Sequence, residues 1–294
     1  MSAVLAIDHL HVAIGKGPRA TNVLRGVNLN VEAGEVRGLV GESGAGKSML
    51  GRALFGLLPA NATVRGRIAF EGRDLLGLPD KERLSLLGRR IALIPQDPMT
   101  SLNPVRRVGA QLTAVLRRHL GLSKRAALNR AAELLADVAI GDPTRVLELY
   151  PHEMSGGMRQ RVLIAIAFAC DPTLVIADEP TTALDVTVQR QVLQLVERLR
   201  LRHAAAILFV THDLGVVAKI CRSMSVLHAG RVLEEGLTAD VLAKPRHAYT
   251  SALLAATPRA DRPSEALKPV PAALLESLRA EAHRLDQQFA MRPA

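Results

Sequence analysis

The chain has 294 residues, of which 48% are hydrophobic, so it is long enough to bury a substantial core and is not expected to be disordered. Its formal net charge of +10 suits a nucleic-acid partner, an anionic membrane surface or an arginine-rich exterior in water. Only 2% of the residues are aromatic and none is Trp, which argues against a single-strand nucleic-acid binder that stacks bases on rings.

The first half of the chain alternates predicted strands and helices. Short runs of alternating apolar and polar residues predict strands that lead into a glycine-rich turn. These runs occupy residues 10–14, 27–31 and 36–40. A helix is expected from Lys47 to about Leu58, followed by a further pair of strands at Arg67–Phe70 and Ile91–Ile94. The block Val108–Ala139 is rich in charges and helix formers with little β-branching, which predicts a helical insertion.

The second half returns to alternating buried strands and helices. Residues 174–177 and 206–210 predict buried strands, and Val186–Arg202 predicts the helix between them, with an apolar face. Such alternation is typical of a mainly parallel sheet. Beyond about Thr238 the composition shifts toward Ala, Pro and Arg, with a final helix expected over Pro271–Phe289.

Apolar segments and cysteines limit where the protein can act. The longest apolar runs, residues 162–170 and 204–210, are too short to cross a bilayer, and Asp8 interrupts the N-terminal apolar stretch. We therefore expect no transmembrane helix, no secretory signal and a cytoplasmic location. Cys170 and Cys221 lie in apolar segments without a Cys or His at metal-ligand spacing, so we expect buried, reduced thiols.

The sequence GESGAGKS follows the expected strand at 36–40 and precedes the expected helix, which is the context of a phosphate-binding P-loop. Glycines let backbone N–H groups curl around phosphate oxygens, the helix N-terminus adds a partial positive charge, and Lys47 reaches the β- and γ-phosphates. The Ser48 hydroxyl is expected to bind Mg²⁺. The nucleotide-binding residues expected here are Gly41, Glu42, Ser43, Gly44, Ala45, Gly46, Lys47, Ser48 and Met49.

Two adjacent carboxylates end the apolar run at 174–177, at the carboxyl edge where a parallel α/β sheet places its site. Asp178 is expected in the Mg²⁺ shell. Glu179 is expected to orient the water that attacks the γ-phosphate.

Further motifs in this order resemble those of ABC ATPases. Gln96 resembles the glutamine of the Q-loop, and MSGGMRQ at residues 154–160 resembles the ABC signature motif. Ala183-Leu184-Asp185 resembles the D-loop, and His212 resembles the switch histidine. The resemblance implies catalytic roles for Glu179, Gln96 and His212. It also implies that Gln96 is a Mg²⁺ ligand with Ser48 and Asp178, and that nucleotide is bound by Ser155, Gly156, Gly157, Asp178 and Asp185.

Subfamily motifs are similar to those of ATPases of oligopeptide, dipeptide and nickel importers. They are QDPMTSLNP at 96–104, YPHEMSGGMRQR at 150–161, ADEPTTALDVTVQ at 177–189 and KPRHAYTSALLAATP at 244–258. The chain most resembles the first of two non-identical ATPase subunits. The implied cofactors are ATP and Mg²⁺. The implied partners are two transmembrane permeases, a second ATPase that completes an ATP-sandwich dimer and, indirectly, an external solute-binding protein, at the cytoplasmic face of the inner membrane.

The resemblance implies a P-loop NTPase α/β fold, RecA-like, with a mainly parallel sheet. We expect an N-terminal antiparallel β subdomain and the first half of the core in residues 1–100, and a helical subdomain with the signature in 101–165. The second half of the core is expected in 166–240 and a C-terminal extension in 241–294.

Three positions depart from the family pattern. Ile14 stands where an aromatic ring often stacks on adenine, and Met158 stands where the general signature has Gln. No cysteine follows Cys221, so no iron-sulfur cluster is expected. The solute stays open between peptides, nickel, glutathione and other small molecules. Two other hypotheses are a soluble ABC ATPase acting on nucleic acid or ribosomes and a regulatory module that holds ATP without turnover. The intact Glu179 and His212 argue against the second.

Overall fold

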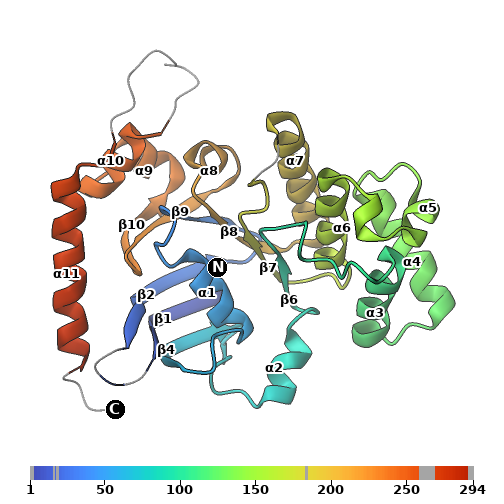
Figure 1. Cartoon of the computed structure of the whole chain (residues 1–294), viewed down its shortest axis with the longest axis horizontal. Helices are drawn as coiled ribbons and strands as arrows, with labels where there is room; N and C mark the ends of the chain where they lie inside the picture. Colours follow the sequence, from blue (N-terminus) through green and yellow to red (C-terminus); the bar gives the residue numbers. More distant parts are fainter. Residues whose placement is uncertain (1–2, 16, 18–19, 183–184, 258–268, 291–294) are drawn as a thin grey trace. The chain divides into compact units, whose positions relative to one another are not determined.

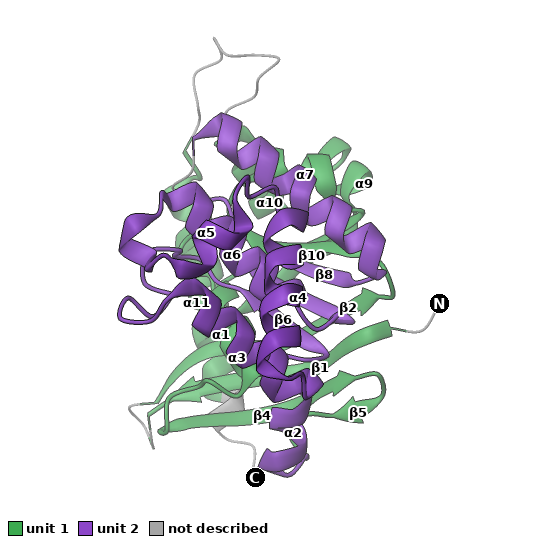
Figure 2. Cartoon of the chain, turned by 90° about the vertical axis from the view of Figure 1, so that its right-hand side faces the viewer, with its two compact units in different colours: residues 1–77, 209–294 green, residues 78–208 purple. Residues whose placement is uncertain are grey.

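The computed structural model describes residues 3–15, 17, 20–182, 185–257 and 269–290. The chain divides into two compact units, one formed by residues 1–77 and 209–294 and the other by residues 78–208 (Figure 2). The four-part division expected from the sequence stays a prediction. In the described part of the chain, no helix combines the length and the apolarity needed to span a bilayer.

The N-terminal part of the first unit is an antiparallel sheet, as predicted, with strand order β2-β1-β4-β5. Figure 1 shows β2, β1 and β4 side by side. Its strands are β1 (Ala3–Ile14), β2 (Thr21–Glu32), β4 (Ala62–Phe70) and β5 (Arg73–Asp74). β1 and β2 are longer than the short predicted runs, because backbone pairing continues through polar residues and irregular register positions.

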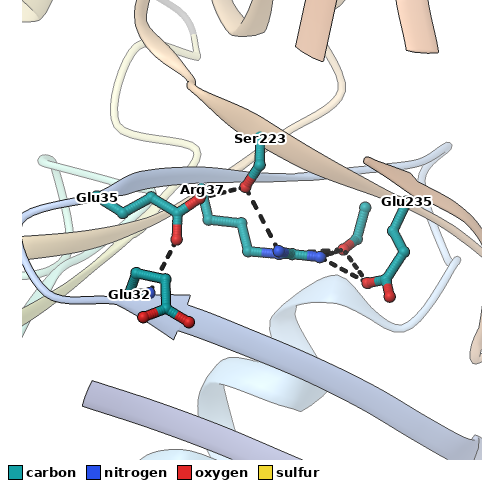
Figure 3. A network of polar contacts seen from close by, with 6 residues as sticks. Glu32, Glu35, Arg37, Ser223 and Glu235 are labelled. Atoms are coloured by element: carbon teal, nitrogen blue, oxygen red, sulfur yellow. Dashed lines mark hydrogen bonds and ion pairs between the residues drawn. The ribbon is translucent and has the colours of Figure 1, made fainter. Parts of the chain in front are cut away.

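A second group of strands in this unit carries the glycine-rich turn. β3 (Val36–Val40) pairs in parallel with β9 (Ser223–His228), and β9 pairs antiparallel with β10 (Arg231–Leu237). Arg37 holds the three strands together: its guanidinium donates to Ser225 Oγ at 2.8 Å and to Glu235 Oε2 at 2.6 Å (Figure 3). Ser223 in turn donates to the buried Glu35 carboxylate. β3, the strand that leads into the turn, is therefore fixed near its start by side-chain hydrogen bonds as well as by backbone pairing.

The described residues of the first unit also form α-helices. They are α1 (Lys47–Phe55), α8 (Leu214–Ile220), α9 (Thr238–Ala243), α10 (Ala248–Ala255) and α11 (Ala272–Ala290). α11 agrees with its prediction to one residue at each end and contacts β2. The predicted end of α1 at Leu58 was wrong, because Gly56 adopts a left-handed φ of 65° and ends the helix at Phe55.

The second unit combines parallel strands with a helical bundle. β6 (Ile91–Ile94) pairs in parallel with β7 (Leu174–Asp178), and β8 (Ala206–Thr211) begins in this unit. The α-helices of this unit are α2 (Asp80–Leu86), α3 (Val108–Leu120), α4 (Lys124–Asp137), α5 (Pro143–Glu148), α6 (Gly156–Phe168) and α7 (Val186–His203).

The helical insertion predicted over 108–139 is confirmed as the two helices α3 and α4. They are separated at Gly121, which has a φ of 67°, and Ser123 caps the second one. The predicted strands at 67–70 and 91–94 both exist but belong to different sheets, β4 beside β1 and β6 beside β7.

Candidate functional site

The glycine-rich turn connects the buried end of β3 to the start of α1. Gly44 and Gly46 have φ values of 82° and 107°, in the left-handed region that glycine adopts without a steric penalty. Gly46 is the N-cap residue of α1, and α1 has neither a capping side chain nor an acidic residue in its first turn. The positive end of the helix dipole is therefore directed at the turn, and no carboxylate in the first turn of α1 offsets it.

Lys47 closes the turn from inside. Its side chain is buried, and its ammonium donates to the carbonyl oxygens of Gly41 at 2.8 Å and Glu42 at 3.0 Å. These bonds curl residues 41–46 around the cation. A buried ammonium and a helix N-terminus at one turn favour an anion of high charge, so the residues present fit a nucleotide triphosphate.

Gly41, at the start of the turn, packs closely against its neighbours. A Cβ atom at Gly41 would lie 2.2 Å from the Leu227 carbonyl oxygen of β9 and 3.1 Å from the Ala45 Cβ. On the other side of the turn, the Gly230 N–H donates to the Ala45 carbonyl at 2.8 Å. The loop conformation is thus held by its backbone neighbours.

His212, also in the first unit, comes directly after β8. The Asp213 side chain caps α8, accepting from Gly215 N at 2.8 Å, and the Asp213 N–H donates to Thr211 Oγ1 at 3.0 Å. These bonds fix the backbone on the C-terminal side of His212. A contact with the γ-phosphate stays a prediction.

The second unit holds the paired carboxylates at the end of β7. Glu179 is buried and accepts hydrogen bonds from Gln96 Nε2 at 3.2 Å and from Thr182 Oγ1 at 3.0 Å. The structure therefore brings together Gln96 and Glu179, which are 83 residues apart in the sequence. Asp178 lies beside them and is partly exposed. Thr182 was not among the predicted site residues, although its hydroxyl follows Glu179 by three positions within the quoted motif.

The signature motif forms the start of α6. Ser155 is the N-cap residue, and its Oγ accepts from the Met158 N–H at 3.3 Å. Because position 158 contributes its backbone to this cap, Met in place of Gln leaves the cap intact. Gly156 has open space where a Cβ would be, and Gly157 has Val188 Cγ1 at 3.4 Å from that position.

Asp185 is the N-cap residue of α7 and accepts from the Val188 N–H at 2.9 Å. The predicted D-loop residues 183 and 184 lie outside the described residues. Ile14 ends β1, opposite Thr21 and Ala62, and the source of adenine stacking stays open.

Two residues near the turn, His228 of β9 and Tyr249 of α10, were not predicted from the sequence. His228 Nδ1 lies 3.9 Å from Glu42 Oε2, and the Tyr249 ring lies 4.4 Å from the His228 ring. Burial lowers the pKa of His228, and the charges of Arg279 and His247 add to this, whereas Glu42 opposes it. A neutral His228 is therefore expected next to Glu42 at neutral pH.

The two cysteines match the prediction of buried thiols. Burial raises the pKa of Cys170 to about 11 and that of Cys221 to about 12. The thiolate form of either is scarce at neutral pH, which makes both poor nucleophiles.

The chain is similar to known protein families and solved structures. Residues 24–182 match the ABC transporter family, and residues 233–283 match the oligopeptide/dipeptide transporter C-terminal region. The chain is 48% identical to a probable peptide ABC transporter ATP-binding protein of Sinorhizobium fredii, covering 88% of this chain and 78% of that one. It is 45% identical to the oligopeptide transport ATP-binding protein of Salmonella typhimurium, covering 92% and 81%.

Among solved structures, the fold is similar to a dimeric ATP-binding cassette in a post-hydrolysis state bound to ADP and Pi. The TM-score is 0.70 at 26% identity, over 80% of this chain and 98% of that one. A P-loop closed by Lys47, a Gln96–Glu179 pair after a buried strand, and a serine-capped signature helix thus occur in a chain whose core matches a single family model. The chain belongs to the ABC transporter family.

Proposed function

We propose that the chain is the ATP-hydrolysing subunit of an ABC importer that takes up oligopeptides or dipeptides. The P-loop geometry and the family supply the ATPase part. The observation that carries the peptide part is the match of residues 233–283 to the oligopeptide/dipeptide transporter C-terminal region, together with relatives named for peptide transport.

The turn of residues 41–48 binds the triphosphate. Its backbone N–H groups and the Lys47 ammonium surround phosphate oxygens, and the start of α1 adds its partial positive charge. Ser48, Asp178 and Gln96 would hold Mg²⁺, which when bound neutralises charge on the β- and γ-phosphates. His212 would contact the γ-phosphate.

Glu179 orients the attacking water. Its carboxylate is buried, so it is a stronger hydrogen-bond acceptor than a solvated one, and the bonds from Gln96 and Thr182 fix its direction. Any movement of Gln96 changes the orientation of Glu179, which gives a physical route from the segment that follows β6 to the rate of hydrolysis.

A complete site needs a second cassette. Ser155, Gly156 and Gly157 at the start of α6, with Asp185, would face nucleotide bound to the P-loop of a partner ATPase, and two permeases would receive the movement. The chain would sit at the cytoplasmic face of the inner membrane. ATP closes such a dimer only because it binds the closed state better than the open one.

Co-purification tests the transport assignment. The tagged chain is isolated from gently solubilised membranes, bound proteins are identified, and ATPase activity is measured in the same fraction. Two multi-span permeases and a second ATPase support the proposal, and the accompanying solute-binding protein can then be screened against peptides, nickel and glutathione. A chain that instead co-purifies with nucleic acid or ribosomes contradicts it.

Glu179→Gln tests the hydrolytic role. The change keeps the size of the side chain but removes the carboxylate base, and it places a second amide beside the Gln96 amide. We expect ATP binding to persist while turnover falls about 10²- to 10⁴-fold. Glu276→Gln, the same change at an exposed position of α11, is the control. Unchanged hydrolysis by Glu179→Gln would remove Glu179 from the mechanism.

A further inference from the structure

The tight turn between β9 and β10 is hydrogen-bonded to the P-loop and also to β2. The Gly230 N–H donates to the Ala45 carbonyl of the P-loop at 2.8 Å, and the Gly230 carbonyl accepts from the Arg25 N–H of β2 at 2.8 Å. The Arg25 guanidinium also donates to the Ala229 carbonyl at 2.7 Å. Arg25 therefore holds, by its backbone and its side chain, the turn that holds the P-loop.

The C-terminal helix α11 in turn holds Arg25. Asp286 accepts two hydrogen bonds from the Arg25 guanidinium, at 2.7 Å from Nε and 2.9 Å from the terminal nitrogen. The two side chains are only 15% and 23% exposed, so water screens this pair less than an ordinary surface ion pair. A second pair, Arg231 with Glu281 at 2.8 Å, joins α11 to the first residue of β10.

The contact is tight enough to transmit a displacement. A Cβ atom at Gly230 would lie 2.1 Å from the Val23 carbonyl oxygen. A Cβ at Gly46 would lie 3.0 Å from Leu24 Cδ2 and 3.1 Å from the same Val23 oxygen. The segment of β2 that ends at Arg25 thus touches the P-loop and the β9–β10 turn at once, and neither contact has slack to absorb a shift.

A second contact from the end of the chain reaches the P-loop at Glu42. The Tyr249 ring of α10 is fully buried against the His228 ring, which lies beside the Glu42 carboxylate. The Tyr249 hydroxyl has no hydrogen-bond partner by geometry among the described residues, and burial with the nearby Glu42 charge raises its pKa. Two separate parts of residues 241–294 are therefore connected to the loop through intervening residues, α11 through Arg25 and α10 through His228.

We propose that Asp286 is a positioning residue for nucleotide binding, acting on the P-loop through Arg25 and the Ala229–Gly230 turn. The proposal rests on the proposed binding of ATP at residues 41–48. With the pair formed, the loop is held in its curled, phosphate-binding conformation before the nucleotide arrives. Without it, part of the binding free energy is spent on ordering the loop, so affinity falls. Whether α11 is held by the Arg25–Asp286 pair would accordingly set the affinity of the cassette for ATP.

Binding of a non-hydrolysable ATP analogue tests this in the full-length chain. The dissociation constant of AMP-PNP with Mg²⁺ is measured by calorimetry for the wild type, Asp286→Asn, Asp286→Glu, Arg25→Met and the Arg25→Met/Asp286→Asn double variant. Glu276→Gln, which removes the same charge from an exposed position of α11, is the matched control. Melting temperatures are recorded for all variants, and binding is measured well below the lowest of them.

We expect Asp286→Asn and Arg25→Met each to raise the dissociation constant about three- to tenfold. The double variant should resemble the weaker-binding single variant because the two residues act through one contact, whereas Asp286→Glu should recover most of the affinity. Glu276→Gln should leave it unchanged. A dissociation constant for Asp286→Asn equal to that of the wild type, with or without a lower melting temperature, overturns the proposal. Absence of any AMP-PNP binding by the wild type instead overturns the proposed ATP site itself, and with it this inference.

Discussion

Gly41→Ala tests whether the P-loop owes its conformation to close backbone packing. The added Cβ would lie 2.2 Å from the Leu227 carbonyl oxygen, which is 0.8 Å short of the 3.0 Å below which such contacts essentially never occur. Leu227 cannot retreat easily, because β9 is paired with β3 on one side and with β10 on the other. The start of the loop must therefore move instead.

That movement displaces an acceptor of the Lys47 ammonium, since the Gly41 carbonyl lies 2.8 Å from Nζ. Overpacking of this kind costs about 1–3 kcal/mol of unfolding free energy. We expect ATP affinity to fall at least about tenfold as well, which corresponds to roughly 1.4 kcal/mol. Denaturant unfolding measures the first quantity, and calorimetric titration with ATP measures the second.

Gly141→Ala is the matched control, because a Cβ there meets nothing within 4 Å and the backbone needs no positive φ. It should change stability by less than about 0.5 kcal/mol and leave ATP binding intact. If Gly41→Ala binds ATP within twofold of the wild type and unfolds at the same denaturant concentration, the loop is soft and the steric argument is refuted.

Four further outcomes are expected from the described contacts and burial. Lys47→Ala should lower ATP affinity by about 10²-fold or more, because the buried ammonium and both loop hydrogen bonds are lost, and calorimetric titration checks it. Arg37→Met should lower the unfolding free energy by about 2–3 kcal/mol in denaturant, because the buried Ser225 loses its charged donor. Cys221 should react with a thiolate-selective reagent at pH 8 about a thousandfold more slowly in the folded than in the unfolded chain, because burial, aided by the Glu35 charge, raises its pKa from 9.0 to about 12. The raised pKa of Cys221 also contributes stability to the folded chain below pH 9, and this contribution is lost as the pH rises from 9 toward 12. In that pH range the unfolding free energy should therefore fall less steeply for Cys221→Ala than for the wild type.

Sequence reasoning worked best where the determinants lie next to one another. The P-loop turn depends on residues within a few positions, and the structure has a glycine-rich turn at the start of α1 where the motif predicts it. The caps of α6 at Ser155 and of α7 at Asp185 are equally local, although the sequence analysis did not predict them. Amphipathic periodicity likewise located α7 to one residue at each end, and the final helix predicted over 271–289 agrees with α11 equally well.

Strand partners and the β9–β10 hairpin could not be read in the same way. Two predicted strands proved to lie in different sheets, because periodicity identifies a strand but not its neighbour. The hairpin turns through Ala229 and Gly230, both at positive φ, with values of 46° and 75°. Alanine is rare in that conformation, so the dipeptide lacks the usual Asn-Gly or Asp-Gly signal. The Arg25–Asp286 pair spans 261 residues and depends on where α11 packs, which no local pattern encodes.

Glu179 carries an argument for function that does not depend on its motif. Its φ of 45° places a glutamate in the left-handed region, where an L-residue with a Cβ loses roughly 1–2 kcal/mol. Its carboxylate is also buried, which carries a desolvation cost, and it accepts hydrogen bonds from Gln96 and Thr182. A residue selected for stability alone would avoid both costs, since glycine or asparagine fits the backbone and a smaller polar group fits the space. Backbone strain and a buried charge at one position at the end of a parallel strand are what a site for orienting a reactant requires, and this supports the role proposed for Glu179.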